Sequence, residues 1–272
     1  VELDFVDIAT RPSSHLGLVL TAAQRGLHVL CQKPLTDSLL EAQQMVDACQ
    51  AAGVTFMVNE NGRFQGWFRH MKALLDKGML GKPFYARIEE RSRSTLPLPT
   101  FTEQPYLSEM PQLVIYEMGL HYLDIARCFF LSSDYLSATP NRTSPQNAGE
   151  DVAIILADFN GLTCIVDLSW ASVVKPAPDI SWGCVRIEGE NGTLILDQNG
   201  VLTVYSDSQQ LTWVFPKDTV ERSFVAAQRH FVECIEAGRE PETSGSETIK
   251  SLQLVFSAYR ASEERRILTL NS

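Results

Sequence analysis

The sequence predicts an α/β part built on a parallel sheet, followed by an α+β part in which a large, mostly antiparallel sheet carries helices on one face. Over the first 60 residues, short apolar runs alternate with helical patterns of 12–15 residues, which is typical of βαβ units. Between about residues 136 and 215, β-like runs follow one another closely, and several are joined by Asn-Gly pairs that favour hairpin turns. The pattern changes after Asn61, so we expect one domain over residues 1–62 and a second over residues 63–272.

The first domain is expected to contain three strands separated by two helices. The strands are predicted at residues 5–9, 28–31 and 54–58, and the helices at about 13–25 and 38–52. Ser13-Ser14 favours the start of the first helix, while Gly26 and Gly53 favour the ends of the two helices. Right-handed crossovers would place the three strands side by side in one sheet.

The second domain is expected to be dominated by strands. Strands are predicted at about 84–91, 151–159, 164–170, 182–188, 193–196, 202–205 and 211–215, and helices at about 66–77, 115–130, 221–237 and 246–264. The segment from Arg93 to Met110 is rich in Pro, Ser and Thr and has no clear period. Its length in a compact domain indicates a loop that has a function or binds a partner.

Composition narrows the class of protein. The 272 residues, 44% of them hydrophobic, suit one large domain or two ordinary ones. The net charge of −10 argues against a general nucleic-acid binder, and no apolar run reaches the ~20 residues of a membrane helix, so neither partner is expected. No secretion signal is visible, and the six cysteines form no C-x-x-C pair, which indicates reduced thiols in a cytoplasmic protein. The histidines and cysteines never cluster at ligand spacing, so no metal site is expected.

Ligands of open parallel sheets bind beyond the carboxyl ends of the strands. This rule selects three segments, which are expected to share one ligand: Thr10-Arg11-Pro12, Gln32-Lys33-Pro34 and Asn59-Glu60-Asn61. Lys33 stands out, because Pro34 restricts its backbone and its ammonium group can stabilise developing negative charge. The alternative is a surface lysine in a turn.

Three neighbouring side chains are weaker candidates. Asn61 and Arg63 follow the third predicted strand and have the groups to hydrogen-bond a substrate or cofactor, although turn chemistry and a surface ion pair would explain them equally well. His15 opens a predicted helix after Pro12, where a histidine more often makes a structural contact.

A second constellation lies on the helix predicted over residues 115–130. Glu117, His121 and Asp124 are spaced i, i+4 and i+7, which places them on one helix face. A carboxylate one turn from a histidine orients the ring and raises its basicity, and a histidine suits general-base work. The alternatives are a structural hydrogen bond and a metal site, but no further ligand is in view for a metal.

The ordered motifs resemble the Gfo/Idh/MocA family, that of glucose–fructose oxidoreductase and inositol dehydrogenase. The resemblance covers nearly the whole chain. Its elements are Thr10-Arg11-Pro12 with His15, Gln32-Lys33-Pro34, Asn61-Gly62-Arg63-Phe64, the helix segment with Gly119, His121 and Asp124, and the turn from Gly189 to Leu194. The resemblance implies that the first domain is the C-terminal part of a Rossmann-type dinucleotide-binding domain, and that the second is a substrate and oligomerisation domain.

The activity that the resemblance implies is reversible hydride transfer between NAD or NADP and a carbinol carbon, usually of a sugar, polyol or related small molecule. Lys33 would contact the reacting hydroxyl and the nicotinamide end, His121 would act as acid/base, and Glu117 would hydrogen-bond the substrate or the histidine. Removing hydride from carbon requires loss of the hydroxyl proton, so a base must reach that oxygen.

The resemblance also assigns wider binding sets and an assembly. The cofactor would contact Thr10, Arg11, Pro12, His15, Gln32, Lys33, Pro34 and Asn61. The substrate would contact Lys33, Arg63, Glu117, His121 and Asp124. Family members commonly pair through the open face of the large sheet, so a homodimer or homotetramer is expected.

The chain departs from the family pattern in three ways. Gln32 stands where glutamate is usual, which removes a charge beside Lys33, and Glu117 stands where many members carry aspartate. No G-x-G-x-x-G loop is present, and roughly the first 60 residues of a member, which hold the pyrophosphate, have no counterpart. We therefore expect an N-terminally truncated oxidoreductase. The alternatives are a non-catalytic sugar- or partner-binding protein of the same fold, and a subunit whose exposed sheet face serves assembly.

Overall fold

The computed structural model describes residues 3–95, 101, 104–173 and 183–270. The chain packs as two compact units, one formed by residues 1–65 and 220–253 and the other by residues 66–219 and 254–272. The sequence analysis grouped residues 63–272 together, whereas the structure assigns residues 63–65 and 220–253 to the first unit. The two units are described in turn.

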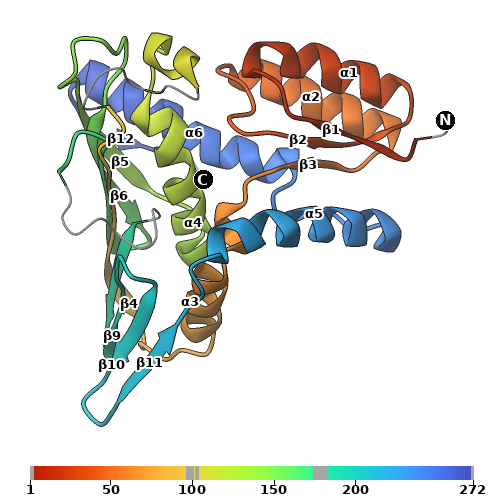
Figure 1. The fold of residues 1–272 in the computed structure, drawn as a ribbon. Helices are drawn as coiled ribbons and strands as arrows, with labels where there is room; N and C mark the ends of the chain where they lie inside the picture. Colours follow the sequence, from red (N-terminus) through yellow and green to blue (C-terminus); the bar gives the residue numbers. More distant parts are fainter. Residues whose placement is uncertain (1–2, 96–100, 102–103, 174–182, 271–272) are drawn as a thin grey trace. The chain divides into compact units, whose positions relative to one another are not determined.

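The first unit holds the predicted parallel sheet, in the order β1-β2-β3 (Figure 1). Its elements are β1 (Phe5–Ile8), the 3-10 turn Pro12–Ser14, α1 (His15–Gln24), β2 (His28–Cys31), α2 (Leu39–Ala52) and β3 (Phe56–Val58). The side chain of Ser38 caps α2 by accepting from the amide of Glu41, and Gly53 ends the helix at φ 66°. The predicted elements are confirmed with shifts of one or two residues at their ends.

A helix from the far end of the chain completes this unit. In Figure 1, α1 and α2 lie on one side of the small sheet and α5 (Thr219–Ala237) on the other. Phe231 of α5 packs in an apolar cluster with Leu30 and Met57 of the sheet, and its ring meets Phe5 edge to face at 5.4 Å between centroids. Parallel sheets need apolar cover on both faces, which explains why residues 220–253 pack here.

The second unit holds a nine-stranded sheet in the order β11-β10-β9-β8-β4-β7-β6-β5-β12. Its strands are β4 (Pro83–Arg91), β5 (Tyr135–Asn141), β6 (Val152–Phe159), β7 (Leu162–Ser169), β8 (Cys184–Gly189), β9 (Gly192–Leu196), β10 (Val201–Tyr205), β11 (Gln210–Val214) and β12 (Leu268–Thr269). All pairings are antiparallel except that of β4 with β7. The helices α3 (Gly66–Asp76) and α4 (Leu120–Phe130) lie on one side of this sheet, as predicted (Figure 1).

Two of the three predicted Asn-Gly turns are confirmed. Asn160-Gly161 joins β6 to β7, and Asn199-Gly200 lies between β9 and β10. Between β8 and β9 the loop is Glu190-Asn191, because Gly189 pairs with Gly192, the first residue of β9. Asn160 and Gly161 have φ values of 54° and 82°, the left-handed conformation that matches the twist of a two-residue hairpin.

The sequence analysis did not predict β5. Pro140 lies within it and lacks the N–H that a central strand needs. The structure accommodates the proline because β12 pairs only with Tyr135 and Leu136, so beyond them β5 is an edge strand. The predicted strand from Trp182 begins at Cys184, and Trp182 lies outside the described residues, as do 96–100 and 102–103 of the predicted loop.

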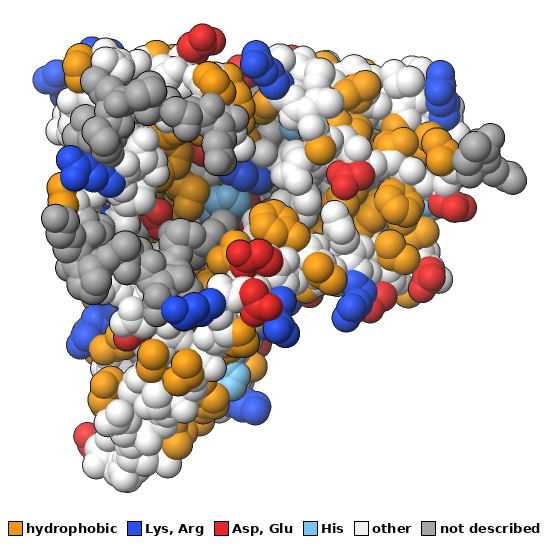
Figure 2. All heavy atoms as spheres, viewed as in Figure 1, with side chains coloured by type: hydrophobic (Ala, Val, Ile, Leu, Met, Phe, Trp, Pro, Cys, Tyr) orange, Lys and Arg blue, Asp and Glu red, His pale blue; other side chains and the backbone are white. Residues whose placement is uncertain are grey.

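Two further helical elements complete the description. Pro105–Glu109 forms a 3-10 turn, and α6 spans Gly245–Glu264. Over the described ranges, no helix has both the length and the apolar character required to cross a membrane. On the face drawn in Figure 2, acidic and basic side chains are interspersed.

Candidate active site

The carboxyl ends of the three parallel strands meet at one edge of the first unit. The hydrogen-bond ladder continues past the strands, since the amide of Gln32 donates to the carbonyl of Ile8 (2.9 Å) and that of Asn59 to Cys31 (2.7 Å). The segments starting at Thr10, Gln32 and Asn59 therefore begin side by side. This is the arrangement that the sequence predicted.

His15 connects two of these segments. Its ring is fully buried, with Nδ1 2.9 Å from the carbonyl oxygen of Leu35 and Nε2 3.0 Å from that of Thr10. Both ring nitrogens thus face backbone carbonyls. The geometry supports the structural interpretation of His15, which fixes the loops on either side of the predicted cofactor edge.

Lys33 lies between residues that are held by hydrogen bonds, beginning with the amide of Gln32, which donates to the carbonyl of Ile8. The Lys33-Pro34 peptide bond is cis. Behind it, Leu35 is bound to His15, and the buried hydroxyl of Thr36 donates to the Glu41 carboxylate at 2.7 Å. The Lys33 side chain itself is half-buried. A fixed backbone beneath a partly accessible ammonium group is suited to placing a positive charge at a defined position.

The segment after β3 is more deeply buried. Asn61 donates from its side-chain amide to the hydroxyl of Ser223 on α5 (2.8 Å), and the amide of Gly62 donates to the Glu60 carboxylate (2.9 Å). Arg63 donates to the carbonyl of Glu242 at 3.3 Å. Asn61 and Arg63 therefore each make a structural hydrogen bond.

Asn59 has a different environment. Its side chain is 2% exposed, and Oδ1 has no hydrogen-bond donor within the parts of the chain that the structure describes. A buried carbonyl oxygen at the carboxyl edge requires a donor. An amide N–H₂ of a bound group, such as the carboxamide of a nicotinamide, fits this requirement.

The second constellation lies in the second unit. Residues Ile115–Gly119 form a π-helical turn that leads directly into α4. A continuous α-helix over 115–130 was predicted, so this part of the prediction is wrong. The turn carries Glu117, and α4 carries His121 and Asp124; all three are buried, at 9%, 2% and 3% exposure. π-Turns inside helices are frequent at functional sites.

Asp124 makes a local contact. Its carboxylate lies 3.8 Å from the guanidinium of Arg127, one turn further along α4, and both side chains are largely buried. An aspartate held this way is suited to stabilising the helix that carries His121. Its predicted contact with substrate stays a prediction.

Sequence reasoning missed a buried pair beside His121. The Tyr122 hydroxyl donates to the Glu90 carboxylate at 2.6 Å, and both side chains are buried. Burial raises the pKa of Glu90 to about 7, although Tyr122, the Gly183 amide and Arg91 each lower it. Burial and the nearby Glu90 charge raise the pKa of Tyr122 well above its usual value. The available signal was the alternation of β4, in which Ala86, Ile88 and Glu90 share the inner face.

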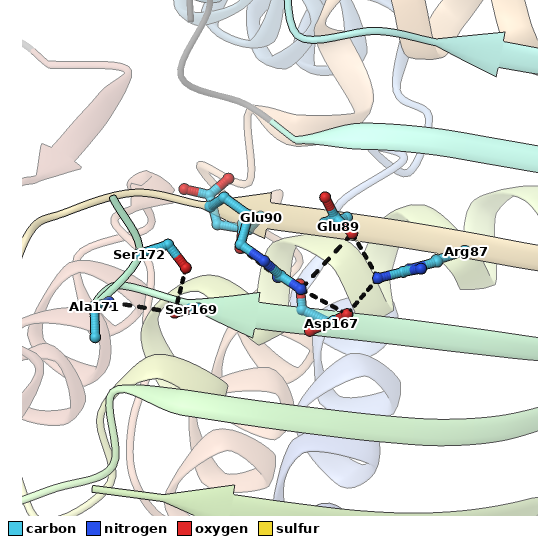
Figure 3. A network of polar contacts seen from close by, with 8 residues as sticks. Arg87, Glu89, Glu90, Asp167, Ser169, Ala171 and Ser172 are labelled. Atoms are coloured by element: carbon cyan, nitrogen blue, oxygen red, sulfur yellow. Dashed lines mark hydrogen bonds and ion pairs between the residues drawn. The ribbon is translucent and has the colours of Figure 1, made fainter. Parts of the chain in front are cut away.

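The outer face of β4 carries an ionic network (Figure 3). Arg87 and Arg91 each contact Asp167 of β7 at 2.7 Å, and they lie 2.6 Å and 3.7 Å from Glu89. Although burial alone would raise it, the hydrogen bonds and charges of Arg91 and Arg87 hold the pKa of Asp167 below its usual value. The network pairs two positive with two negative side chains and is neutral overall.

No group of three or more histidine, cysteine or acidic side chains suited to a metal ion occurs among the described residues. Comparison with known proteins identifies the family of the chain. Residues 1–60 match the family described as "Oxidoreductase family, NAD-binding Rossmann fold", and residues 68–195 match the "GFO/IDH/MocA C-terminal domain".

The chain belongs to the Gfo/Idh/MocA oxidoreductase family. It is 38% identical to a D-apiose dehydrogenase of Paraburkholderia graminis over 283 residues, a match that covers all of this chain and 74% of the relative. It is 36% identical to a D-apiose dehydrogenase of Rhizobium rhizogenes, covering 99% of this chain and 80% of that protein.

A solved structure supports the same assignment. An oxidoreductase from Agrobacterium radiobacter, in complex with NAD+, L-tartaric acid and magnesium, superimposes with a TM-score of 0.91 at 36% identity, over 98% of this chain and 80% of that one. The predicted family, fold class, oxidoreductase activity and nicotinamide cofactor are confirmed.

Proposed function

We propose that this oxidoreductase acts on a pentose or a similarly small polyhydroxylated compound, oxidising a carbinol carbon with NAD+. The support for the substrate class is the pair of D-apiose dehydrogenases that match 99–100% of the chain at 36–38% identity. More distant relatives, at 24% and 27% identity, are named myo-inositol and D-xylose dehydrogenases. All of these substrates present a secondary or hemiacetal hydroxyl on a polyol frame.

The reactive groups in this proposal are Lys33, His121 and Glu117. The nicotinamide, when bound, supplies the hydride acceptor. A ring nitrogen of His121 takes the proton of the reacting hydroxyl, and the ammonium group of Lys33 donates a hydrogen bond to the hydroxyl oxygen and stabilises its developing charge. The carboxylate of Glu117 orients the imidazole. The main support for these roles is that His121 and Glu117 are both buried on one helical segment that includes a π-turn.

Cofactor contacts are proposed for the carboxyl edge of the small sheet. The predicted set is Thr10, Arg11, Pro12, His15, Gln32, Lys33, Pro34 and Asn61. Asn59 joins this set, because its buried Oδ1 is suited to a donor from the cofactor. The hydrogen bonds of His15 and Asn61 within the protein indicate that these two act by holding the edge in place.

The test is NAD+ reduction, followed at 340 nm, with D-apiose, D-xylose and myo-inositol as substrates. We expect His121→Ala and Lys33→Ala each to lower kcat by about 10²-fold or more, with Lys77→Ala, a lysine at the end of α3, as the control. Turnover that is unchanged in both variants would contradict the assigned roles. Binding of NAD+ without turnover of any polyol would favour the non-catalytic alternative.

We also propose that copies of the chain pair through the open face of the nine-stranded sheet. Tyr135, Ile154 and Leu156 lie on adjacent strands with exposures of 50%, 46% and 42%. The neutral network around Asp167 lies beside Ile154 in register, so covering it would bury no net charge. Light scattering should show a dimer or tetramer, and Leu156→Lys should shift the protein toward the monomer.

A cytoplasmic location is proposed as well, supported by six free cysteines.

A further inference from the structure

The segment that carries Glu117 begins at a buried carboxylate. Glu150, just before β6, is 8% exposed. Its carboxylate accepts from the amides of Leu113 (3.2 Å) and Ile115 (3.0 Å), and its backbone carbonyl accepts from the amide of Val114 (3.1 Å). Three successive amides at the start of the helical segment therefore donate their hydrogen bonds to one residue, Glu150.

The fourth amide, that of Tyr116, is linked to Glu150 by hydrogen bonds through the phenol of a tyrosine. The phenol oxygen of Tyr259, on α6, accepts from the amide of Tyr116 at 3.2 Å and donates to the Glu150 carboxylate at 2.6 Å. Burial and the charge of Glu150 raise the pKa of Tyr259, so the phenol remains a donor. The first amide bonded within the segment is that of Glu117, which donates to the carbonyl of Leu113 at 2.8 Å.

These contacts account for all four N–H groups that a helix start leaves without an internal partner. The carboxylate also lies at the positive end of the helical dipole, where a negative charge is stabilising. Gly149 allows the close approach, because a Cβ there would lie 2.6 Å from the carbonyl oxygen of Met110 and 2.8 Å from the Cβ of Leu113.

We propose that Glu150 and Tyr259 are positioning residues that set the place of Glu117 and His121. Glu117 is the first residue after the four anchored amides, and His121 follows one turn later, so a change at the anchor moves both side chains. The anchor consists of buried groups from two segments outside the helix, the chain just before β6 and α6, and removing either group leaves a buried amide or carboxylate without its partner. This inference rests on the roles proposed for Glu117 and His121.

The test compares Tyr259→Phe and Glu150→Gln with a matched control. Tyr259→Phe keeps the ring and removes only the hydroxyl, and Glu150→Gln exchanges one acceptor oxygen for a donor. The control is Thr143→Val, which removes a hydroxyl that donates to the Asp151 carboxylate at 2.9 Å without touching the helical segment. Three experiments are made on each protein: steady-state kinetics for kcat and KM, the ring-proton chemical shift of His121, and hydrogen exchange of the amides of residues 113–116.

We expect Tyr259→Phe and Glu150→Gln to lower kcat by roughly tenfold or more, since a displacement of about 1 Å is costly to a positioned catalytic group. The KM for NAD+ should stay within about twofold, and the His121 ring signal should move, while Thr143→Val leaves all of these unchanged. The proposal is overturned if the amides lose protection in both variants and yet kcat and the His121 signal match the wild type.

The measurements separate this proposal from the proposed function. If the wild-type protein turns over none of the sugars, the proposed substrate fails, and the His121 signal in the two variants still decides whether the anchor positions that side chain. If the wild-type protein is active and the variants match it in both kcat and the His121 signal, only the anchor proposal fails.

Discussion

Replacing Glu90 by glutamine should change how the stability of the second unit depends on pH. Glu90 is 3% exposed, and its carboxyl pKa is raised to about 7 by burial from an ordinary value of 4.5. The unfolded chain would release this proton near pH 4.5, whereas the folded protein holds it until about pH 7. Between these values the folded state binds more protons than the unfolded state.

The direction and size of the change in unfolding free energy follow from this difference in bound protons. Stability from the neutral carboxyl is fully present below about pH 4.5 and is lost as the pH rises through about 7. A difference of about 2.5 pH units, at about 1.4 kcal/mol per unit, amounts to about 3 kcal/mol. Glutamine is neutral throughout, so the free energy of unfolding of Glu90→Gln relative to wild type should increase by about 3 kcal/mol between pH 4.5 and 8.

Tryptophan fluorescence is the appropriate signal for urea unfolding. All four tryptophans lie between residues 66 and 219, so the signal reports the second unit. Glu89→Gln is the control, because Glu89 lies on the same strand but faces the ionic network on the outer side. A difference between Glu90→Gln and wild type that stays constant from pH 4.5 to 8 would refute the reasoning.

Other side chains lead to further predictions. Tyr122→Phe removes the donor to Glu90 and should lower the free energy of unfolding by about 1–2 kcal/mol at pH 8 and by less at pH 5, in the same urea titrations. Phe231→Ala leaves a cavity in the apolar cluster of the first unit and should cost about 3–5 kcal/mol, seen as a lower thermal midpoint by circular dichroism. Gly245→Ala would place a methyl group 2.5 Å from a phenylalanine ring and should cost about 1–3 kcal/mol, whereas Gly17→Ala, with open space around it in α1, should stabilise the protein by about 1 kcal/mol. A gain of thermal stability in Gly245→Ala, or a loss in Gly17→Ala, would contradict the packing argument.

The parts of the fold that were predictable have local causes. The strands of the small sheet are apolar runs between glycine-terminated helices, and two connections of the large sheet carry Asn-Gly, at residues 160–161 and 199–200. The parts that were missed depend on distant partners. β5 contains Pro140 and forms only because β6 supplies its main partner. The placement of α5 with the first unit depends on Phe231 meeting Leu30 and Met57, which lie 201 and 174 residues away in sequence.

The same distinction applies to the candidate site. Lys33 and His121 were found because they belong to short motifs, in which a proline or a helix-spaced acid lies a few residues away. The π-turn at Glu117 has no such signature, since the contacts at its start come from Glu150 and Tyr259. Tyr122 likewise finds its partner, Glu90, 32 residues away. His15 and Asn61, which hold the cofactor edge, were found because they belong to the same short motifs, whereas Glu150, Tyr259 and Glu90 lie far along the chain from the residues they contact and have no local signal.

The two faces of strand β4 belong to different parts of the second unit. One face is part of the surface proposed for pairing, and the other face bears α4, which carries His121. Successive side chains of β4 point to opposite faces of the sheet. Arg87, Glu89 and Arg91 lie on the open face, and Glu90 lies on the face that bears α4. A substitution such as Glu89→Lys would turn the neutral network into one with three positive charges and one negative. Two copies pairing through this face would then oppose like charges, so assembly should weaken with falling salt. The Glu90–Tyr122 contact lies on the other face, but Arg91 of the network also lowers the pKa of Glu90. A loss of catalytic rate that is shared by the monomeric Glu89→Lys and Leu156→Lys proteins would therefore show that assembly itself supports the site.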